Sequence, residues 1–519
     1  MQLYKYYRVL TTLLLLLFTS PLWAQYAYPK REFRGVWVAT LDNIDWPSKQ
    51  GLSADEQKKE FISLLDFHKL NGMNAVIVQV RSEGDALYPS KYTPWSKSLS
   101  GKQGVSPTPY YNPLRFMISE AHKRGMEFHA WINPFRALSN YVNEDPAYNH
   151  ITRSHPEWII TYGDLKIINP GIPAARRHII KVIKELLMDY DIDALHIDDY
   201  FYPYPIKGAS LSDYSTYKTY RGAYSNIADW RRHNINEFIK DVHEVIVKNK
   251  PMVKFGVSPF GVWRNQKESK AGSPTNSAYT CYDHLYADTR LWLQKGWIDY
   301  IAPQAYQNTS HKRIPYQPLI EWWAKNTFGK HLYVGHATYR VGNKYEDGWD
   351  SNKEIPTQVR INRSNKAHGS IMYNSSSLLM NRQHVTDSIR NNLFYVPALP
   401  PRMPWIDNVP PNKPYNVQVS QTTKGVVLTW QAPIRASDGD TPSYYVIYST
   451  KSRKPDINNP LDILAVIPAS QRYYFDTEAR STNSFYYAIT SLDRLFNESI
   501  PVIPDNKKNK NSAVITSGR

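Results

Sequence analysis

The sequence has almost no cysteine and no long apolar run. Cys281 is the only cysteine among 519 residues, which excludes an internal disulfide. The apolar run from Val9 to Phe18 is far shorter than the ~20 residues that a membrane-spanning helix needs. Basic residues precede this run and Leu22–Ala24 follows it, as in a cleaved secretory signal. We therefore expect residues 1–24 to be a signal peptide, with no transmembrane segment and no lipid anchor on the mature chain.

Acidic residues are also scarce relative to basic ones. The chain carries 63 Lys and Arg against 46 Asp and Glu, a net charge of +17. Such a surface favours anionic partners, unless the excess is simply solvated lysine. A secreted chain without disulfides is typical of the periplasm or surface of a bacterium, where nucleic acid is not the expected partner. We expect a cell-wall glycan or a membrane surface instead. Nothing in the sequence indicates an oligomeric state.

Short β-rich segments alternate with amphipathic helical patterns between residues 30 and 395. The expected strands are Gly35–Thr40, Ala75–Val80, Glu127–Ile132, Ala194–Ile197, Lys254–Ser258, Tyr300–Gln304, His331–His336 and Gly369–Tyr373. The expected helices are Ala54–Leu70 with a capping box at Ser53 and Glu56, Leu114–Arg124, Ala174–Tyr190, Ala228–Lys248 and Leu319–Asn326. Eight such units with right-handed crossovers predict an α/β fold, a closed (β/α)8 TIM-type barrel. An open doubly wound sheet is the alternative, but no glycine-rich phosphate loop follows the first strand.

The composition changes after the expected barrel. Residues 396–414 are rich in proline and predict a stiff linker. Short alternating segments then predict a small all-β sandwich over residues 415–502, which resembles a fibronectin type III domain around Trp430, Tyr448 and Asp493. Residues 503–519 are rich in Lys, Asn and Ser, and we expect a disordered basic tail there.

The most informative segment is Asp193–Pro205, where a short apolar strand ends in two adjacent carboxylates. Asp198 and Asp199 end the strand, and the aromatic residues Tyr200–Tyr202 and Tyr204 follow. The carboxyl ends of strands are where α/β barrels place their chemistry. Aromatic rings suit the C–H faces of sugars, and paired carboxylates cut glycosidic bonds by acid and base catalysis. The segment therefore predicts a glycoside hydrolase site, although adjacent aspartates elsewhere usually cap a helix or face solvent.

Polar and aromatic side chains gather at the same end of nearly every expected strand. The candidates for substrate binding are Trp37, Arg81, His129, Trp131, Asn133, His196, Tyr202, Trp263, Gln304 and Tyr306. In this interpretation the three tryptophans and Tyr202 are stacking platforms. His196 and Asn133 support the carboxylate pair, and Gln304 and Tyr306 contact the substrate. The concentration of such residues at one end of the barrel is the second argument for a site there.

Two catalytic schemes are compatible with these residues. In the first, one carboxylate attacks the sugar and a second, on another strand, protonates the leaving oxygen; the two would lie roughly 5–5.5 Å apart for retention or about 6.5–9.5 Å for inversion. Glu83 and Asp288 are the candidate partners. In the second, the 2-acetamido group of the substrate attacks, Asp198 orients it and Asp199 is the general acid/base. Adjacent like charges raise one pKa and hold a proton near neutral pH. The lack of an obvious second carboxylate elsewhere favours the second scheme.

Several candidates also have structural interpretations. A buried histidine such as His196 is more often a satisfied hydrogen-bonding residue than a catalytic one. Glu83 could pair with the neighbouring arginine, and Asp288 could cap the helix that follows it. Metal hydrolysis is the rival enzyme class, with His196, Asp198 and Asp199 as ligands, but no His-x-x-x-His spacing accompanies them. We expect neither a metal nor another cofactor.

Four motifs in order on successive expected strands resemble the glycosyl hydrolase-like family 10. They are Arg34-Gly-Val-Trp-Val38, His129-Ala-Trp-Ile-Asn-Pro-Phe-Arg136, His196-Ile-Asp-Asp-Tyr-Phe-Tyr-Pro203 and Trp297-Ile-Asp-Tyr-Ile-Ala-Pro-Gln-Ala-Tyr306. The resemblance covers roughly residues 30–395 and implies a (β/α)8 barrel with catalytic carboxylates at Asp198 and Asp199. It also implies a substrate, because exported members are associated with cleaving peptidoglycan glycan strands stripped of peptides. Family 18 chitinases are less similar, since Tyr200 stands where their catalytic glutamate would be.

These observations together predict an exported glycoside hydrolase that cleaves an N-acetylated glycan, foremost peptide-free peptidoglycan strands. Two alternatives stay open. One is a catalytically silent glycan-binding protein that uses the barrel cleft, with the sandwich as a spacer. The other is a surface hydrolase that digests dietary or host polysaccharide.

Overall fold

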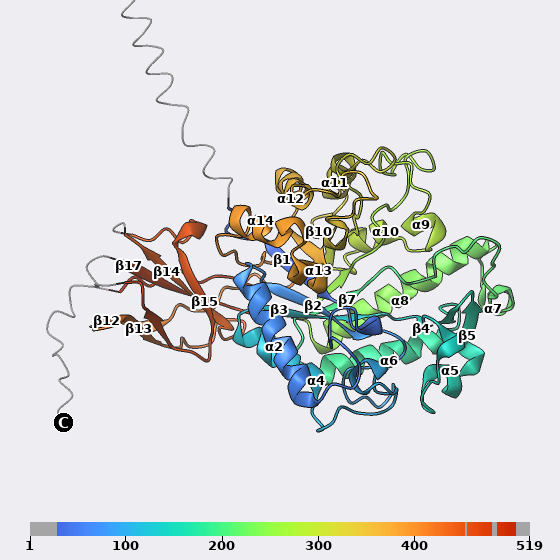
Figure 1. Cartoon of the computed structure of the whole chain (residues 1–519), viewed down its shortest axis with the longest axis horizontal. Coiled ribbons are helices and arrows are strands. Elements are labelled where there is room, and N and C mark those ends of the chain that lie inside the picture. The colour runs from blue at the N-terminus through green and yellow to red at the C-terminus, as the bar shows by residue number, and fades with distance from the viewer. Residues whose placement is uncertain (1–27, 452–453, 480–484, 505–519) are drawn as a thin grey trace, which may run out of the picture.

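Eight parallel strands close into a barrel in the computed structural model, which describes residues 28–451, 454–479 and 485–504 (Figure 1). Around the barrel the order is β1-β11-β10-β9-β8-β7-β3-β2. The bounds are β1 Phe33–Val38, β2 Ala75–Arg81, β3 Glu127–Ile132, β7 Ala194–Ile197, β8 Lys254–Val257, β9 Tyr300–Ile301, β10 His331–Ala337 and β11 Gly369–Tyr373. The predicted TIM-type barrel is confirmed. Parallel strands are buried on both faces, which is why they appear in the sequence as continuous apolar runs.

Helices form a ring outside the barrel. The longer ones are α2 Ala54–Leu70, α4 Pro113–Lys123, α6 Pro173–Asp189, α8 Ile227–Asn249, α11 Tyr316–Lys325, α12 Glu354–Ser364 and α14 Val385–Asn392. The shorter ones are α3 Lys97–Ser100, α5 Ile151–Ser154, α7 Tyr214–Tyr220, α9 Cys281–His284, α10 Thr289–Gln294 and α13 Ser375–Met380. The capping box predicted at the start of α2 is present, with the side chain of Ser53 accepting from the backbone N–H of Glu56.

The structure departs from the predicted barrel elements at three places, and two of them have a local cause. The sixth strand, expected to reach Gln304, ends at Ile301, and Pro303, which has no N–H to donate to a ladder, follows it closely. The helices α12 and α14 were not predicted, because their sequences are mostly polar and offer few apolar residues at helical spacing. After β3 the chain also forms an antiparallel sheet of β4 Arg136–Leu138, β6 Leu165–Ile168 and β5 Ile159–Tyr162.

Two three-stranded antiparallel sheets follow the barrel. The first contains β12 Tyr415–Thr422, β13 Gly425–Gln431 and β16 Tyr473–Asp476; the second contains β15 Ile463–Pro468, β14 Tyr444–Thr450 and β17 Tyr486–Leu492. They pack face to face around Trp430, whose ring lies 5.2 Å from that of Tyr445. The predicted all-β sandwich is therefore present, and its likeness to a fibronectin type III domain stays a prediction.

The linker and the sandwich close the amino-terminal end of the barrel. Met403 is fully buried among the barrel-interior side chains, and Trp405 donates its indole N–H to Asp299 Oδ1 at 2.8 Å. Asp299 directly precedes β9. Arg494 of the sandwich likewise approaches Asp193, the residue before β7, with Nη2 3.3 Å from Oδ1. The sandwich thus sits at the amino-terminal end of the barrel and leaves the carboxyl ends of the strands uncovered, and the β4–β6 insert lies on that opposite side (Figure 1).

The expected signal peptide, residues 1–24, lies outside the described residues, as does the tail beyond residue 504. Within the residues that the structure describes, no helix combines the length and the apolar character that a membrane span requires.

We predict that Met403→Ala destabilises the barrel. The substitution would leave a cavity at the closed end of the barrel interior, and such truncations cost about 2–5 kcal/mol. Urea unfolding followed by tryptophan fluorescence measures the loss. Met380→Ala is the matched control, since the side chain of Met380 is 60% exposed on α13, and we expect a change within about 0.5 kcal/mol. Equal effects of the two substitutions would contradict this account of the linker.

Candidate active site

A cavity of about 440 Å³ opens at the carboxyl ends of the barrel strands. Its wall is made of residues within or just after seven of the eight strands, and it contains Trp37, Ala39, Leu41, Ile44, Gln79, Trp131, Arg136, Asp198, Asp199, Tyr200, Tyr204, Ser258, Gln304, Tyr306 and Tyr373. Asp198 and Asp199 directly follow β7, as the sequence predicts. Among the described residues, they are the only carboxylates that line this cavity.

Asp198 is held by donors from two neighbouring segments. The side-chain amide of Asn133, just after β3, donates to Asp198 Oδ2, and the guanidinium of Arg136 lies 3.7 Å from the same oxygen. The backbone N–H of Tyr200 donates to Oδ1 at 3.3 Å. Arg136 is itself positioned by stacking over the ring of Tyr200, 4.2 Å from its centroid. All these contacts favour the ionised form of Asp198.

Asp199 has neutral partners instead. The hydroxyl of Tyr204 donates to Asp199 Oδ2, and the side chain of Gln304 also contributes a hydrogen bond. The same amide N–H₂ group of Gln304 is held in place because it also donates to the carbonyl of Ser258 at 2.9 Å. The two adjacent carboxylates therefore face different chemical surroundings, one cationic and one neutral.

The pair holds a proton near neutral pH. Burial raises the pKa of Asp198 to about 7; the charge of Asp199 adds to this increase and Arg136 opposes it. Burial also raises the pKa of Asp199, against the hydrogen bonds of Tyr204 and Gln304. Both carboxyl groups are about 95% buried, so ionising both at once is unfavourable. One group can then act as an acid while the other carries the charge.

A second layer of hydrogen bonds positions Asn133. Gln79 of β2 donates to Asn133 Oδ1 at 2.6 Å, which leaves the Asn133 amide N–H₂ to face Asp198. The other end of Gln79 is fixed, because its Oε1 accepts from the backbone N–H groups of Thr40 and Leu41 at 3.0 Å. Three strands therefore orient a single donor toward the carboxylate.

His196 lies beneath the cavity, and its hydrogen bonds define its tautomer. Trp37 donates its indole N–H to His196 Nε2 at 3.3 Å, and an indole nitrogen can only donate. His196 Nε2 is therefore an acceptor, so Nδ1 carries the proton and donates to the Tyr300 hydroxyl at 2.9 Å. Tyr300 in turn donates to His129 Nδ1 at 2.9 Å, and His129 Nε2–H faces Glu127 at 3.3 Å. Burial lowers the pKa of His196 well below its usual value, so it stays neutral.

Aromatic rings form the walls of the cavity. Trp37 packs edge-on against Tyr373 at 6.0 Å, and Tyr373 stacks with Tyr306 at 5.9 Å. Trp131 lies on another side, and its buried indole N–H has no partner among the described residues. This combination of ring faces and a free donor suits a sugar, which offers both C–H faces and hydroxyl oxygens.

Other predicted site residues lie outside this cavity. Glu83 accepts from the backbone N–H of Ser139 at 2.6 Å, and Asp288 caps α10 by accepting from Leu291 N at 3.3 Å. Neither lines the cavity wall, so the structure does not bring them to the Asp pair. The remaining candidates are held by other parts of the protein. Arg81 donates to the carbonyl of Asn133, and His129 lies deeper in the barrel. The ring of Tyr202 packs on Tyr286 at 5.2 Å, and that of Trp263 packs on Trp322 at 5.8 Å.

Nine lining residues are absent from the candidates chosen from the sequence, and two of them, Gln79 and Tyr200, position Asn133 and Arg136 as described above. Arg136, Tyr204, Tyr373 and Ser258 each reach the cavity from a loop or strand end. Arg136 ends one of the motifs quoted above and Tyr204 lies in the segment Asp193–Pro205, but only the fold shows that they contact the two carboxylates. His196, considered as a metal ligand, has both ring nitrogens in hydrogen bonds.

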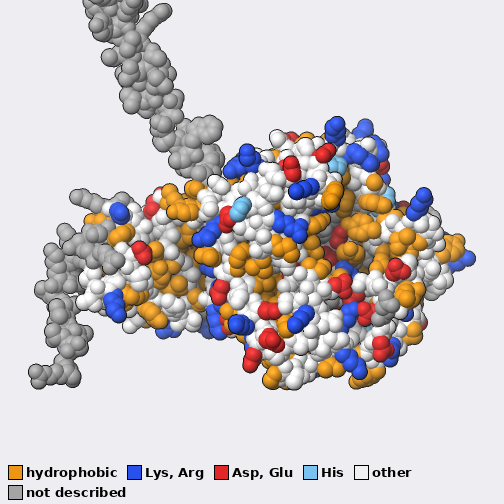
Figure 2. Space-filling view, viewed as in Figure 1, with side chains coloured by type: hydrophobic (Ala, Val, Ile, Leu, Met, Phe, Trp, Pro, Cys, Tyr) orange, Lys and Arg blue, Asp and Glu red, His pale blue; other side chains and the backbone are white. Residues whose placement is uncertain are grey.

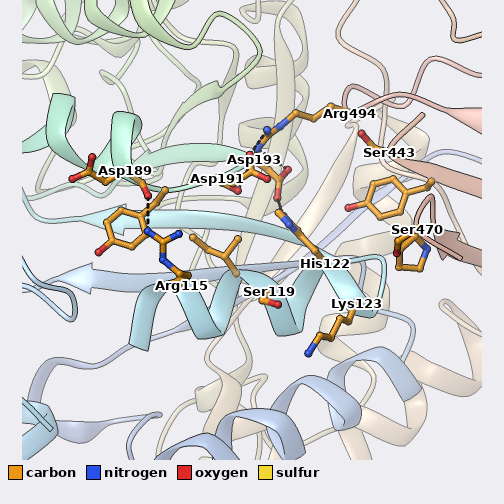
Figure 3. A pocket seen from close by; sticks show the side chains of 14 residues that line it. Arg115, Ser119, His122, Lys123, Asp189, Asp191, Asp193, Ser443, Ser470 and Arg494 are labelled. Carbon is orange, nitrogen blue, oxygen red and sulfur yellow. Dashed lines mark hydrogen bonds and ion pairs between the residues drawn. The ribbon is translucent and has the colours of Figure 1, made fainter. Parts of the chain in front are cut away.

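A larger cavity, about 500 Å³, lies between α4 and the sandwich (Figure 3). His122 Nε2 lies 2.8 Å from Asp193 Oδ2, and Arg494 approaches the other oxygen of the same carboxylate. Asp193 precedes β7, whereas Asp198 follows it, so this cavity is at the opposite end of the barrel. It is a seam between the two parts of the chain and shares none of the residues around the buried Asp pair.

Comparison with known proteins finds a matching family and several similar proteins. Glycosyl hydrolase-like 10 matches residues 32–352. Glycosyl hydrolase YngK of Bacillus subtilis is 43% identical over 478 residues, covering 91% of this chain and 93% of that relative. Glycosyl hydrolase DigH of Escherichia coli is 41% identical over 346 residues, covering 62% of this chain and 77% of that relative. The PgaB glycoside hydrolase domain from Bordetella bronchiseptica aligns with 70% of this chain and 99% of its own, at 14% identity and a TM-score of 0.47.

We predict that Arg136→Gln shifts the pH profile of glycan hydrolysis upward. Removing the cation beside Asp198 disfavours the anion, so the pair keeps its proton to higher pH, by on the order of one unit. The pH dependence of kcat/KM measures the shift. Arg136→Lys retains the charge and should keep most of the profile in place. A profile that stays unchanged, or moves downward, in Arg136→Gln would contradict the coupling of these two groups.

Proposed function

Since this chain belongs to the glycosyl hydrolase-like 10 family and is a glycoside hydrolase, we propose that it is exported and cleaves an N-acetylated glycan, namely peptide-free strands of peptidoglycan. One observation carries the proposal: the cavity contains two adjacent buried carboxylates with different partners and, among the described residues, no third one. A scheme that needs a distant second carboxylate has no candidate in this wall. A substrate whose own acetamide attacks needs only the adjacent pair.

The two carboxylates take different roles in this scheme. In the free pair burial and the charge of Asp199 raise the pKa of Asp198 to about 7. When the substrate binds, the shared proton passes to Asp199, and Asp198, next to Arg136 and Asn133, carries the negative charge. It accepts from the acetamide N–H and stabilises the positive charge that develops as the acetamide oxygen attacks the anomeric carbon. Asp199, next to the neutral Tyr204, holds the proton and gives it to the leaving glycosidic oxygen. After departure of that sugar, Asp199 takes a proton from the attacking water.

The surrounding residues bind and orient the sugar. Trp37, Trp131 and Tyr306 offer ring faces, and the unpartnered Trp131 indole N–H offers a donor to a hydroxyl or acetamide oxygen. His196 acts indirectly. As a neutral acceptor it holds the Trp37 indole and the Ser258 hydroxyl, 3.3 and 2.8 Å from its Nε2, and so supports the base of the cavity.

Charge and the N-terminal sequence support a cell-wall substrate. The net charge of +17 favours a polyanion, and strands freed of peptide carry a carboxylate on every second sugar. On the face shown in Figure 2, basic side chains are spread over the barrel and the sandwich and are mixed with acidic ones. On that face there is no continuous basic patch or stripe of the kind typical of nucleic-acid binding. The signal-like residues 1–24 support export.

We predict that Asp199→Asn lowers kcat on peptide-free peptidoglycan strands by about 10²- to 10⁴-fold, because the proton donor is lost. Asp198→Asn should cost about 10²- to 10³-fold through loss of charge stabilisation. Mass spectrometry of the muro-oligosaccharide products measures both. Asp288→Asn is the control: an asparagine still caps α10, and the side chain lies outside the cavity, so turnover should stay within about threefold.

The same experiment separates the alternatives. Full loss of activity in a folded Asp288→Asn protein would restore the two-carboxylate scheme. Strand binding without any product from the wild type would indicate a silent glycan-binding protein. If the wild type neither binds nor cleaves these strands, the substrate is another polysaccharide, and the products released from chitin-type and host glycans would identify its class.

A further inference from the structure

A second cavity, of about 380 Å³, lies beside the catalytic one on the same face of the barrel. Its wall is formed by two loops that follow the carboxyl ends of β10 and β11, and it contains Tyr339, Arg340, Gly342, Asn343, Lys344, Tyr345, Glu346 and Arg382. No step of the proposed reaction uses these residues. The cavity is nevertheless on the side of the barrel where the glycan must lie.

Tyr339 connects the two cavities. Its ring lies 6.1 Å from the ring of Tyr306 and 5.8 Å from the ring of Tyr373, and both of those rings line the catalytic cavity. The side chain of Tyr339 is 39% exposed. A chain of sugars leaving the catalytic cavity along this aromatic wall would therefore pass over Tyr339 and into the second cavity.

The second cavity is positively charged. Three of its residues are cationic and Glu346 is the only acid among those that line it. Arg340 Nη1 lies 3.2 Å from Glu346 Oε2, and Arg340 Nε lies 3.2 Å from the Tyr339 hydroxyl. Lys344 and Arg382 are both exposed and have no ion-pair partner in the part of the chain that the structure describes. These two cations remain available to a ligand.

Backbone geometry keeps the two loops together. Gly342 has φ +83°, a left-handed conformation that side chains rarely adopt, and a Cβ at this position would lie 3.6 Å from the Cβ of Arg382. The backbone N–H of Gly342 donates to the carbonyl of Trp349, a fully buried residue, at 2.6 Å. The loop that carries Lys344 is therefore fixed to the barrel at its base and lies against Arg382.

We propose that Lys344 and Arg382 form a subsite for a carboxylate borne by a sugar of the glycan, beyond the sugar that is cleaved. This inference rests on the proposed function and extends it. In peptidoglycan the lactyl carboxyl group of a muramic acid residue is an uncharged amide while the peptide is attached. Removal of the peptide exposes a carboxylate. Two unpaired cations next to the cleavage site therefore give the enzyme a preference for peptide-free strands through charge recognition.

The test compares two substrates with two double variants. The substrates are peptide-free peptidoglycan strands and the same strands with their carboxyl groups converted to amides. The variants are Lys344→Gln/Arg382→Gln and the control Lys181→Gln/Lys184→Gln, which removes the same charge from exposed positions on the outer helix α6. Steady-state kinetics gives kcat and KM for each combination.

We expect Lys344→Gln/Arg382→Gln to raise KM for the carboxylate-bearing strands roughly tenfold, with kcat little changed. For wild type, KM should be higher by a similar factor on the amidated strands than on the carboxylate-bearing strands. The variant should have the same KM for both substrates. The control should match wild type on both. Equal losses of the variant on both substrates, or no loss on either, would overturn the carboxylate subsite while leaving the proposed function intact. Failure of wild type to cleave either substrate would overturn both.

Discussion

Burying two adjacent carboxylates is the constraint on which the rest of the site depends. Two like charges without solvent are strongly unfavourable, and the barrel reduces that cost in two ways. The pair keeps one proton, and the remaining charge is offset by Arg136 and Asn133 at Asp198. Because these donors follow β3 while the carboxylates follow β7, and the two strands pair side by side, closure of the barrel brings them together. No single loop could supply this arrangement.

Several polar side chains are buried along the axis of the barrel. Their burial is tolerated because each donates its hydrogen bond to the next residue in one series. Trp37 can only donate and Glu127, paired with the buried Lys254, can only accept. Between them His196, Tyr300 and His129 each donate a hydrogen bond in the direction of Glu127. Each proton of this hydrogen-bond series is therefore assigned to one atom. Because burial lowers the pKa of His196 well below its usual value, it does not compete with the Asp pair for a proton. A buried network of this kind is stable only when all its members are satisfied.

Much of the fold could be predicted because its signals are local. The apolar runs of the parallel strands and the capping box of α2 depend on neighbouring residues alone. The Asp pair was predictable because a short apolar run placed it at a strand end. The sequence could not show which of Tyr202 and Tyr204 faces the cavity, because they are only two residues apart. In the structure Tyr202 packs on Tyr286, and Tyr204 donates to Asp199. The cap that Asp288 forms on α10 is local and could be anticipated from the sequence, whereas the partner of Glu83, Ser139, comes from a distant segment.

One end of the barrel binds the sandwich, and the other end contains the Asp pair. The four-residue strand β7 has Asp193 before it and Asp198 after it; the first pairs with the sandwich and the second with the catalytic donors. The sandwich and linker contact the amino-terminal end through Met403, Trp405 and Arg494, so they stabilise the barrel without covering the cleft. A long glycan strand can then lie across the open end, over the catalytic cavity and the cationic loops beside it. Because the sandwich lies at the end of the barrel opposite the Asp pair, it does not limit the length of a glycan that can enter the cavity.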